Sequence, residues 1–155
     1  MGPDLEKGIH ELSLRMRMLR AIQEDKTSPN DLTERDEMIL SLLNERGKMT
    51  ISQVAAAIPN VSDSTVSTNI TRLWRDKKMV SKTISPENQR TTIVELTEQG
   101  KKAIEVIKQQ RSDRFQTLFS AINVTGDERE VLIKVVSRAI AFFDEHLGLG
   151  NTTDK

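Results

Sequence analysis

Apolar residues recur every three or four positions near the start of the chain, which predicts a first helix with one apolar stripe. The stripe consists of Leu5, Ile9, Leu12, Met16 and Leu19. The segment QEDKTSPND then interrupts this pattern with Pro29 and Asn30, so we expect the helix to end before the next apolar run. A helix with a single apolar stripe needs a second surface to cover it.

Two shorter helices are expected next. Thr33 can cap the first of them with Asp36 as its capping-box partner, and Gly47 ends it. Ser52 can cap the second, which Pro59 closes. Both helices carry apolar residues at helical spacing, so each has one buried side.

A fourth helix is expected from Ser62, whose hydroxyl suits an N-cap. Its apolar positions, Val66, Ile70, Leu73 and Trp74, share one face, and we therefore expect Trp74 to belong to the core. The runs MVSKTI and TTIVEL, separated by SPENQR, then predict a β-hairpin with a polar tip.

The chain ends with two more predicted helices, the first capped by Thr97 and the second by a capping box of Thr125 and Glu128. This order of helices and hairpin predicts a mainly α (α+β) fold, a winged helix-turn-helix with N- and C-terminal dimerisation helices. The predicted parts are a dimerisation helix at 1–31, a DNA-binding domain at 32–97, dimerisation helices at 98–148 and a disordered tail at 149–155.

The polar face of the fourth helix has an unusual composition. It is rich in Ser and Thr, which are poor interior helix formers, and it has no acid between Asp63 and Asp76. An ordinary solvated face mixes Glu with Lys. Residues 48–91 carry seven basic and three acidic side chains, although the whole chain has a net charge of zero. A local basic face of this kind favours a phosphate-bearing partner.

We therefore predict that double-stranded DNA binds this helix and the hairpin. The residues expected nearest base edges are Ser64, Thr65, Thr68 and Arg72, and those nearer phosphates are Ser62, Thr71 and Arg75. The hairpin adds Lys82, Gln89 and Arg90, with Arg90 expected in the minor groove. The alternative to DNA binding is that this Ser- and Thr-rich surface is solvated and has no partner.

Residues 32–100 resemble the MarR family of bacterial winged-helix transcription regulators. The segments LTERDEMILSLL and MTISQVAAAI resemble the helices that lead into the family's DNA-reading helix. The most specific likeness is the wing, NQRTTIVELTEQG, which matches the family's pattern at Arg90, Val94, Leu96, Thr97 and Gly100.

Two positions depart from the family's pattern. Asn88 stands where the family usually has Asp, and Lys78 stands near the place of a usual Gly. The resemblance implies a homodimer that binds a pseudopalindromic operator, usually as a repressor released by a small ligand. It also implies that this ligand is a small aromatic acid or phenol, for which Arg15 or Arg17 is a candidate carboxylate partner. A constitutive DNA binder without a ligand is the alternative.

The apolar stripes of the first and last two helices exceed what one chain can cover, which predicts an obligate homodimer joined through both termini. The expected anchors are Leu12, Leu19, Ile140 and Phe143.

Other function classes fit the chain poorly. It has no cysteine, only His10 and His146 as histidines, and no glycine-rich phosphate-binding motif, so we predict no enzyme, metal or cofactor. No apolar run approaches the roughly 20 residues that span a bilayer, and the setting is expected to be cytoplasmic, without a membrane. A winged helix that binds a protein instead of DNA is the remaining alternative; the acid-free face favours DNA.

Overall fold

The computed structural model describes residues 3–27, 32–58 and 60–147 of the chain. Its contacts divide the chain into residues 1–34 and residues 35–155, and each unit is described by itself. The first unit contains α1 (Pro3–Thr27), so the predicted first helix extends into the polar QEDKT segment. Its apolar stripe is exposed, with Leu12 at 52% and Leu19 at 50% of their full accessibility.

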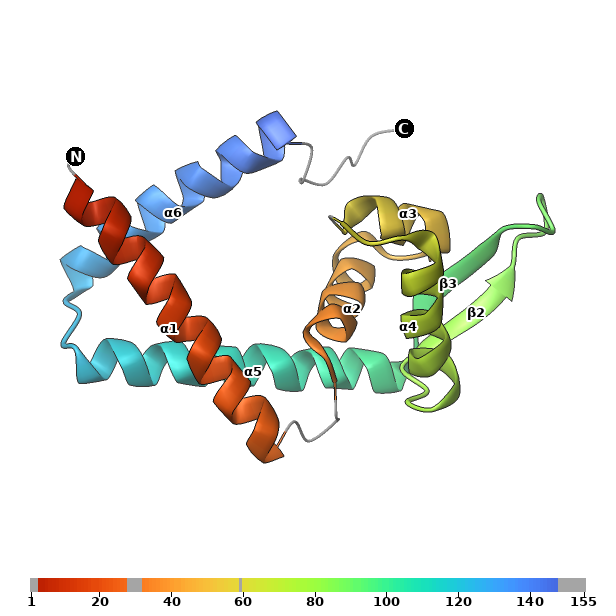
Figure 1. Ribbon diagram of the computed structural model, residues 1–155, viewed down its shortest axis with the longest axis horizontal. Coiled ribbons are helices and arrows are strands. Elements are labelled where there is room, and N and C mark those ends of the chain that lie inside the picture. Colours follow the sequence, from red (N-terminus) through yellow and green to blue (C-terminus); the bar gives the residue numbers. More distant parts are fainter. Residues whose placement is uncertain (1–2, 28–31, 59, 148–155) are drawn as a thin grey trace. The chain divides into compact units, whose positions relative to one another are not determined.

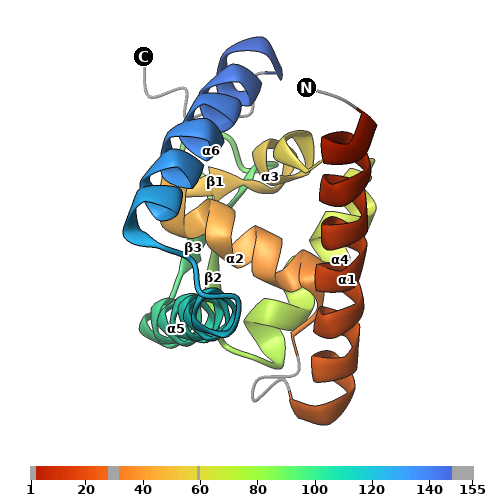
Figure 2. The same cartoon turned by 90° about the vertical axis from the view of Figure 1, so that its left-hand side faces the viewer.

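The remaining elements form a winged helix-turn-helix with long C-terminal helices (Figure 1). They are α2 (Glu34–Arg46), β1 (Met49–Thr50), α3 (Ile51–Ala57), α4 (Asp63–Arg75), β2 (Val80–Ile84), β3 (Thr92–Leu96), α5 (Glu98–Ala121) and α6 (Gly126–Leu147). Figure 2 shows them from a second side, looking along α5. The predicted mainly α (α+β) fold class is confirmed.

The three strands form one antiparallel sheet in the order β1-β3-β2. The predicted hairpin is present, and Lys82 of β2 lies opposite Val94 of β3. The strand β1 was not predicted from the sequence. It contains only two residues, which pair with Val94 and Ile93, and two residues are too few to show an alternating pattern.

The start of α3 differs from the prediction. Thr50 is the N-cap in place of Ser52: its Oγ1 accepts the Gln53 N–H at 3.1 Å, and its own N–H donates to Gln53 Oε1 at 2.9 Å. This reciprocal capping box fixes the helix start two residues earlier. Ser52 instead donates its hydroxyl hydrogen to Asp63 Oδ2 at 3.3 Å and so links α3 to α4.

Three other predicted caps are confirmed. The hydroxyl oxygens of Ser62, Thr97 and Thr125 accept the backbone N–H groups of Thr65, Gly100 and Glu128. The Thr125 cap is a complete capping box, since Glu128 Oε2 accepts the Thr125 N–H at 2.9 Å. These caps hold α4, α5 and α6 at defined starting points in the chain.

The core lies among α2, α3, α4, the sheet and the first turns of α5. Its fully buried side chains include Ile39, Leu40, Val54, Val66, Ile70, Leu73, Val94 and Ile104. Burying an aliphatic side chain of this size contributes about 1.5–3 kcal/mol. The apolar face of α4 therefore offsets the poor intrinsic helicity of its Ser and Thr residues.

Of the residues that the structure describes, Ile104 of α5 is the last along the chain whose side chain is buried in the core. Most of the apolar side chains that follow on α5, at its C-cap and on α6 are exposed, and they include Phe115, Leu118, Ile122, Leu132, Val136, Ile140 and Phe143. Ile140 is 55% exposed and Phe143 is 48% exposed, so both predicted anchors are available to a partner. An apolar surface of this length on two helices is typical of an interaction face.

Lys78, which stands near the place of the family's usual glycine, has a φ angle of +56°. Its carbonyl oxygen accepts the Thr97 hydroxyl hydrogen at 2.7 Å, which holds the backbone in this left-handed conformation. A side chain with a Cβ is strained there, whereas glycine is not.

We predict that Lys78→Gly raises the free energy of unfolding by about 0.5–1 kcal/mol, because relief of this strain exceeds the entropy that glycine adds to the unfolded chain. Urea unfolding at a fixed protein concentration measures the change as a higher midpoint with an unchanged slope. Lys78→Ala is the control, since it removes the charge and keeps the Cβ. A glycine variant no more stable than the alanine variant would show that the φ angle carries no strain.

Candidate nucleic-acid interface

The N-terminal half of α4 presents hydroxyl groups to solvent. Ser64 and Thr68 are exposed, and Thr65 is half-buried. Ser62 Oγ lies 3.0 Å from Ser64 Oγ and 2.9 Å from Thr65 Oγ1, while Thr68 Oγ1 donates to the Ser64 carbonyl oxygen at 3.0 Å. These short side chains allow another backbone to approach closely, and they surround the positive end of the helix dipole, which favours an anion.

Arg72 has a different environment from the one predicted. Its Nη2 pairs with the Asp36 carboxylate of α2, and the Arg72 side chain is only 32% exposed. Asn69 Nδ2 also donates to Asp36 Oδ1, at 3.1 Å. Asp36, which the sequence suggested as a capping residue, is completely buried. Arg72 therefore ties α4 to α2, and this pairing competes with the predicted base contact.

The sequence contains a signal for this buried carboxylate. Asp36 lies three and four residues before Ile39 and Leu40, so it belongs to the face of α2 that faces the core. An acid on a buried face requires a hydrogen-bonding partner, and cations nearly always fill that role. Its partner Arg72 is 36 residues further along the chain and cannot be identified from local spacing.

Trp74 also differs from its prediction, since it is 42% exposed instead of buried in the core. The adjacent Leu73 points into the core. Because successive residues of a helix are about 100° apart, Trp74 lies at the border of the apolar face. Lys82 Nζ lies 5.0 Å and Arg75 Cζ lies 5.9 Å from the centre of its ring. The end of α4 and the base of the hairpin thus share a cluster of one aromatic ring and two cations.

The hairpin tip exposes Gln89 and Arg90. Asn88 shapes this turn, because its Oδ1 accepts the Arg90 N–H at 3.1 Å and its carbonyl oxygen accepts the Thr91 N–H at 2.9 Å. The amide that replaces the family's usual acid therefore bonds to the backbone of Arg90. Figure 1 shows the hairpin projecting beyond α3 and α4, as a wing does.

Comparisons with known proteins agree with this geometry. The family model described as a winged helix DNA-binding domain matches residues 32–100. The uncharacterized HTH-type transcriptional regulator YdgJ of Bacillus subtilis (strain 168) is 34% identical over 100 residues, which are 64% of this chain. The chain spans 58% of that relative's length.

Solved structures share the fold over most of the chain. A mutant MarR from E. coli has a TM-score of 0.71 at 23% identity, covering 90% of this chain and 98% of that one. FabT of Streptococcus pneumoniae, solved in complex with DNA, has a TM-score of 0.71 at 15% identity and covers 92% and 96%. The chain matches a winged helix DNA-binding domain and has the fold of MarR. The homologues and the fold are those of transcription regulators and not of enzymes, in agreement with the prediction.

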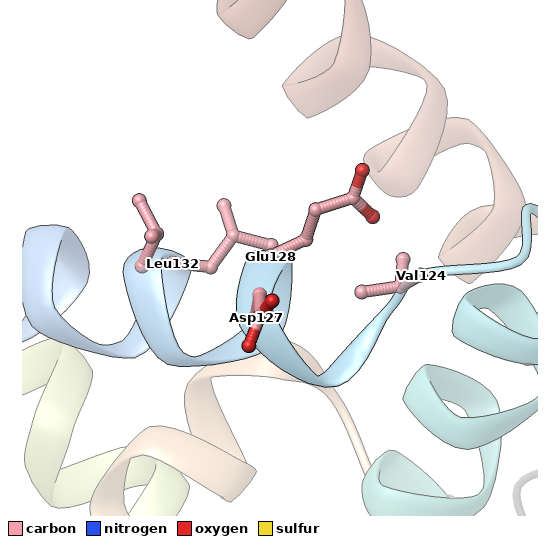
Figure 3. Close-up of a pocket in the computed structure, with 5 residues that line it drawn as sticks. Val124, Asp127, Glu128 and Leu132 are labelled. Atoms are coloured by element: carbon pink, nitrogen blue, oxygen red, sulfur yellow. The ribbon is translucent and has the colours of Figure 1, made fainter.

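The protein has an open hollow of about 470 Å³ at the start of α6. It is lined by Val124, Asp127, Glu128, Val131 and Leu132. Figure 3 shows two carboxylates beside apolar side chains and no cation among the lining residues. The hollow therefore does not suit an aromatic acid.

The other candidate residues lie on the long helices. Arg15 and Arg17 are exposed on α1, and Arg15 pairs with Glu11 at 3.4 Å. The ring of His146 stacks on Phe142 with 4.3 Å between the ring centres. Within residues 3–27, 32–58 and 60–147, no three His, Asp or Glu side chains are grouped as a metal site. No helix in these ranges has both the length and the apolar composition for crossing a bilayer.

Proposed function

We propose that this protein is a sequence-specific, DNA-binding transcription regulator that acts as a homodimer on a pseudopalindromic operator. The observation that carries the proposal is the outer face of α4. It presents hydroxyls and cations without an acid from residue 64 to residue 75, directly beside a wing with an exposed Arg90. A winged helix that bound a protein would not need to exclude acids from this face.

In the proposed complex, α4 enters the major groove. Ser64, Thr65 and Thr68 lie nearest the base edges, because they belong to the exposed N-terminal half of the helix. The sugar-phosphate backbone of the DNA is contacted by Ser62, Thr71, Arg75, Lys82 and Gln89. Arg90 reaches the adjacent minor groove, where a narrow A·T tract concentrates negative potential.

Salt-dependent binding to a selected duplex tests this function. We predict that the parent binds with a steep loss of affinity as salt rises, and that Arg90→Ala weakens binding and reduces the slope of log K against log[salt] by about one. Lys108→Ala is the matched control. Lys108 lies on α5 and pairs with Glu105 at 3.5 Å, so its removal should change neither quantity. Equal effects of the two substitutions would contradict a DNA contact at the wing.

The homodimer is proposed from the exposed apolar residues of α1, α5 and α6. We predict that Ile140→Asp weakens self-association by at least about 30-fold, since a buried anchor typically contributes 2 kcal/mol or more to an interface. Ile84→Asp is the control, because Ile84 is also exposed but lies on the wing. Sedimentation or light scattering distinguishes the dimer from the 17.5 kDa monomer. A parent that is a folded monomer at micromolar concentration would contradict the proposal.

The regulator is further proposed to be a repressor released by a small aromatic acid or phenol, in the cytoplasm of a bacterium. One structural neighbour supports an aromatic acid as the ligand, and a second supports a ligand without naming its chemistry. BpsR of Bordetella bronchiseptica is described as regulated in DNA binding by 6-hydroxynicotinic acid, and PcaV of Streptomyces coelicolor was solved with its natural ligand. Arg15 and Arg17 remain the proposed carboxylate partners. The ligand acts only if it prefers one arrangement of the two α4 helices in the dimer.

A further inference from the structure

The cluster around Trp74 lies where the end of α4 meets β2. Trp74 is the only tryptophan of the chain, and the residue is 42% exposed although Ile70 and Leu73 beside it are fully buried. A large aromatic ring placed at the edge of a core is available to other groups on its exposed side. Here the Lys82 ammonium and the Arg75 guanidinium lie near the ring, at 5.0 Å and 5.9 Å from its centre.

Lys82 is held by two contacts from α4. Besides the Trp74 ring, its Nζ lies 3.4 Å from Thr71 Oγ1 as a donor. The lysine belongs to the strand, whereas both partners belong to the helix, so the contacts join the two elements that DNA would meet. An ammonium above a tryptophan face is attracted by the ring quadrupole, and tryptophan is the strongest such partner.

The contacts of Lys82 with Trp74 and Thr71 do not neutralise its positive charge, which can therefore interact with a phosphate. In the part of the chain that the structure describes, no carboxylate lies within ion-pair distance of its ammonium group. An acid in the position of Trp74 would fix the lysine equally well but would cancel its charge and repel a phosphate. An ammonium has three donors, and Thr71 takes one of them, so the others remain for a ligand.

We infer that Trp74 is a positioning residue that holds Lys82 beside Thr71, so that Lys82 and Thr71 form a preformed contact for one DNA backbone phosphate between α4 and the wing. The inference rests on the proposed DNA-binding function. A lysine side chain normally loses much rotamer freedom when it binds a phosphate. Restraining it before DNA arrives lowers that entropic cost and so raises affinity without adding a charge.

Lys82→Met, Trp74→Leu and their combination test this coupling in the whole 155-residue chain with a selected operator duplex, and Trp74→Phe is the control. Lys82→Met should lower affinity about 5-fold and reduce the salt slope by about one, because it removes a phosphate contact. Trp74→Leu, which keeps an apolar side chain, should lower affinity several-fold. Since both act through the same contact, the double variant should bind no more weakly than Lys82→Met alone. Trp74→Phe retains a ring and should retain most of the affinity.

Additive losses in the double variant, or a Trp74→Leu variant that binds like the parent, would overturn the inference. A parent that binds no duplex would overturn the proposed function as well, so the two failures are distinguishable. Thermal unfolding of each variant checks that the fold is kept.

A second measurement needs no substitution at Trp74. Saturation with duplex should change the emission of this single tryptophan in the parent, and the change should be smaller in Lys82→Met at equal saturation. An emission spectrum that DNA leaves unaltered in the parent would also overturn the inference.

Discussion

Gly100→Ala is expected to lower the free energy of unfolding by about 3 kcal/mol, the upper part of the range for overpacking a close-packed site. A Cβ on Gly100 would lie far inside van der Waals contact of the Met79 carbonyl oxygen, 3.0 Å from its carbonyl carbon and 3.1 Å from Leu96 Cδ2. The same carbonyl oxygen accepts the Thr97 N–H at 3.0 Å. The added Cβ would meet backbone atoms of Met79, so no side-chain rotation can relieve that clash.

Gly126→Ala is the matched control for that substitution. A Cβ at Gly126 would meet nothing within 4 Å, and alanine is a better helix former than glycine, so its stability should be equal or slightly higher. Urea unfolding of both variants at the same protein concentration measures the difference. If Gly100→Ala proved as stable as Gly126→Ala, the close approach of α5 to the start of β2 would be wrong.

Arg72→Ala is expected to lower the free energy of unfolding by about 2–3 kcal/mol. The substitution removes the charged α4 partner of the completely buried Asp36 carboxylate. Asn69 is then its remaining partner on α4. Loss of one member of a fully buried ion pair costs about 3–5 kcal/mol, and the partial exposure of Arg72 reduces this figure.

The double variant Asp36→Leu/Arg72→Met separates stability from DNA reading. Well-packed apolar residues often replace a buried ion pair without loss, so this variant should recover most of the stability lost in Arg72→Ala. If Arg72 serves to orient α4, the double variant should also keep the base preference of the parent. A stable double variant with relaxed base preference would show instead that Arg72 contacts base edges, as its sequence position suggests.

The starts of most helices were predictable because they depend on residues close together in the sequence. The caps at Ser62, Thr97 and Thr125 were correct because an N-cap involves only residues two or three positions apart. The wrong N-cap predicted for α3 also arises from residues close together in the sequence. Thr50 and Ser52 are both good capping residues, and the choice between them was decided by Gln53, whose side chain completes the box with Thr50.

Features that depend on distant parts of the chain were not predictable in this way. The hydroxyl-rich face of α4 follows from helical spacing, and the structure leaves it accessible. The pairing of Arg72 with Asp36 and the exposure of Trp74 depend on how α2 and β2 pack against α4. Spacing along one helix contains no information on those contacts. The sequence therefore did not predict the ion pair of Arg72, and it placed Trp74 in the core, where it is not.

Selection of bound duplexes from a random-sequence DNA pool tests the central claim, that α4 and the wing read DNA, most directly. The account predicts enrichment of a pseudopalindrome whose half-sites are centred about 10 bp apart, with A·T-rich positions where Arg90 meets the minor groove. Thr68→Val should alter the enriched bases within each half-site and leave the half-site spacing unchanged. A folded, dimeric protein that enriched no sequence over the starting pool would contradict the account.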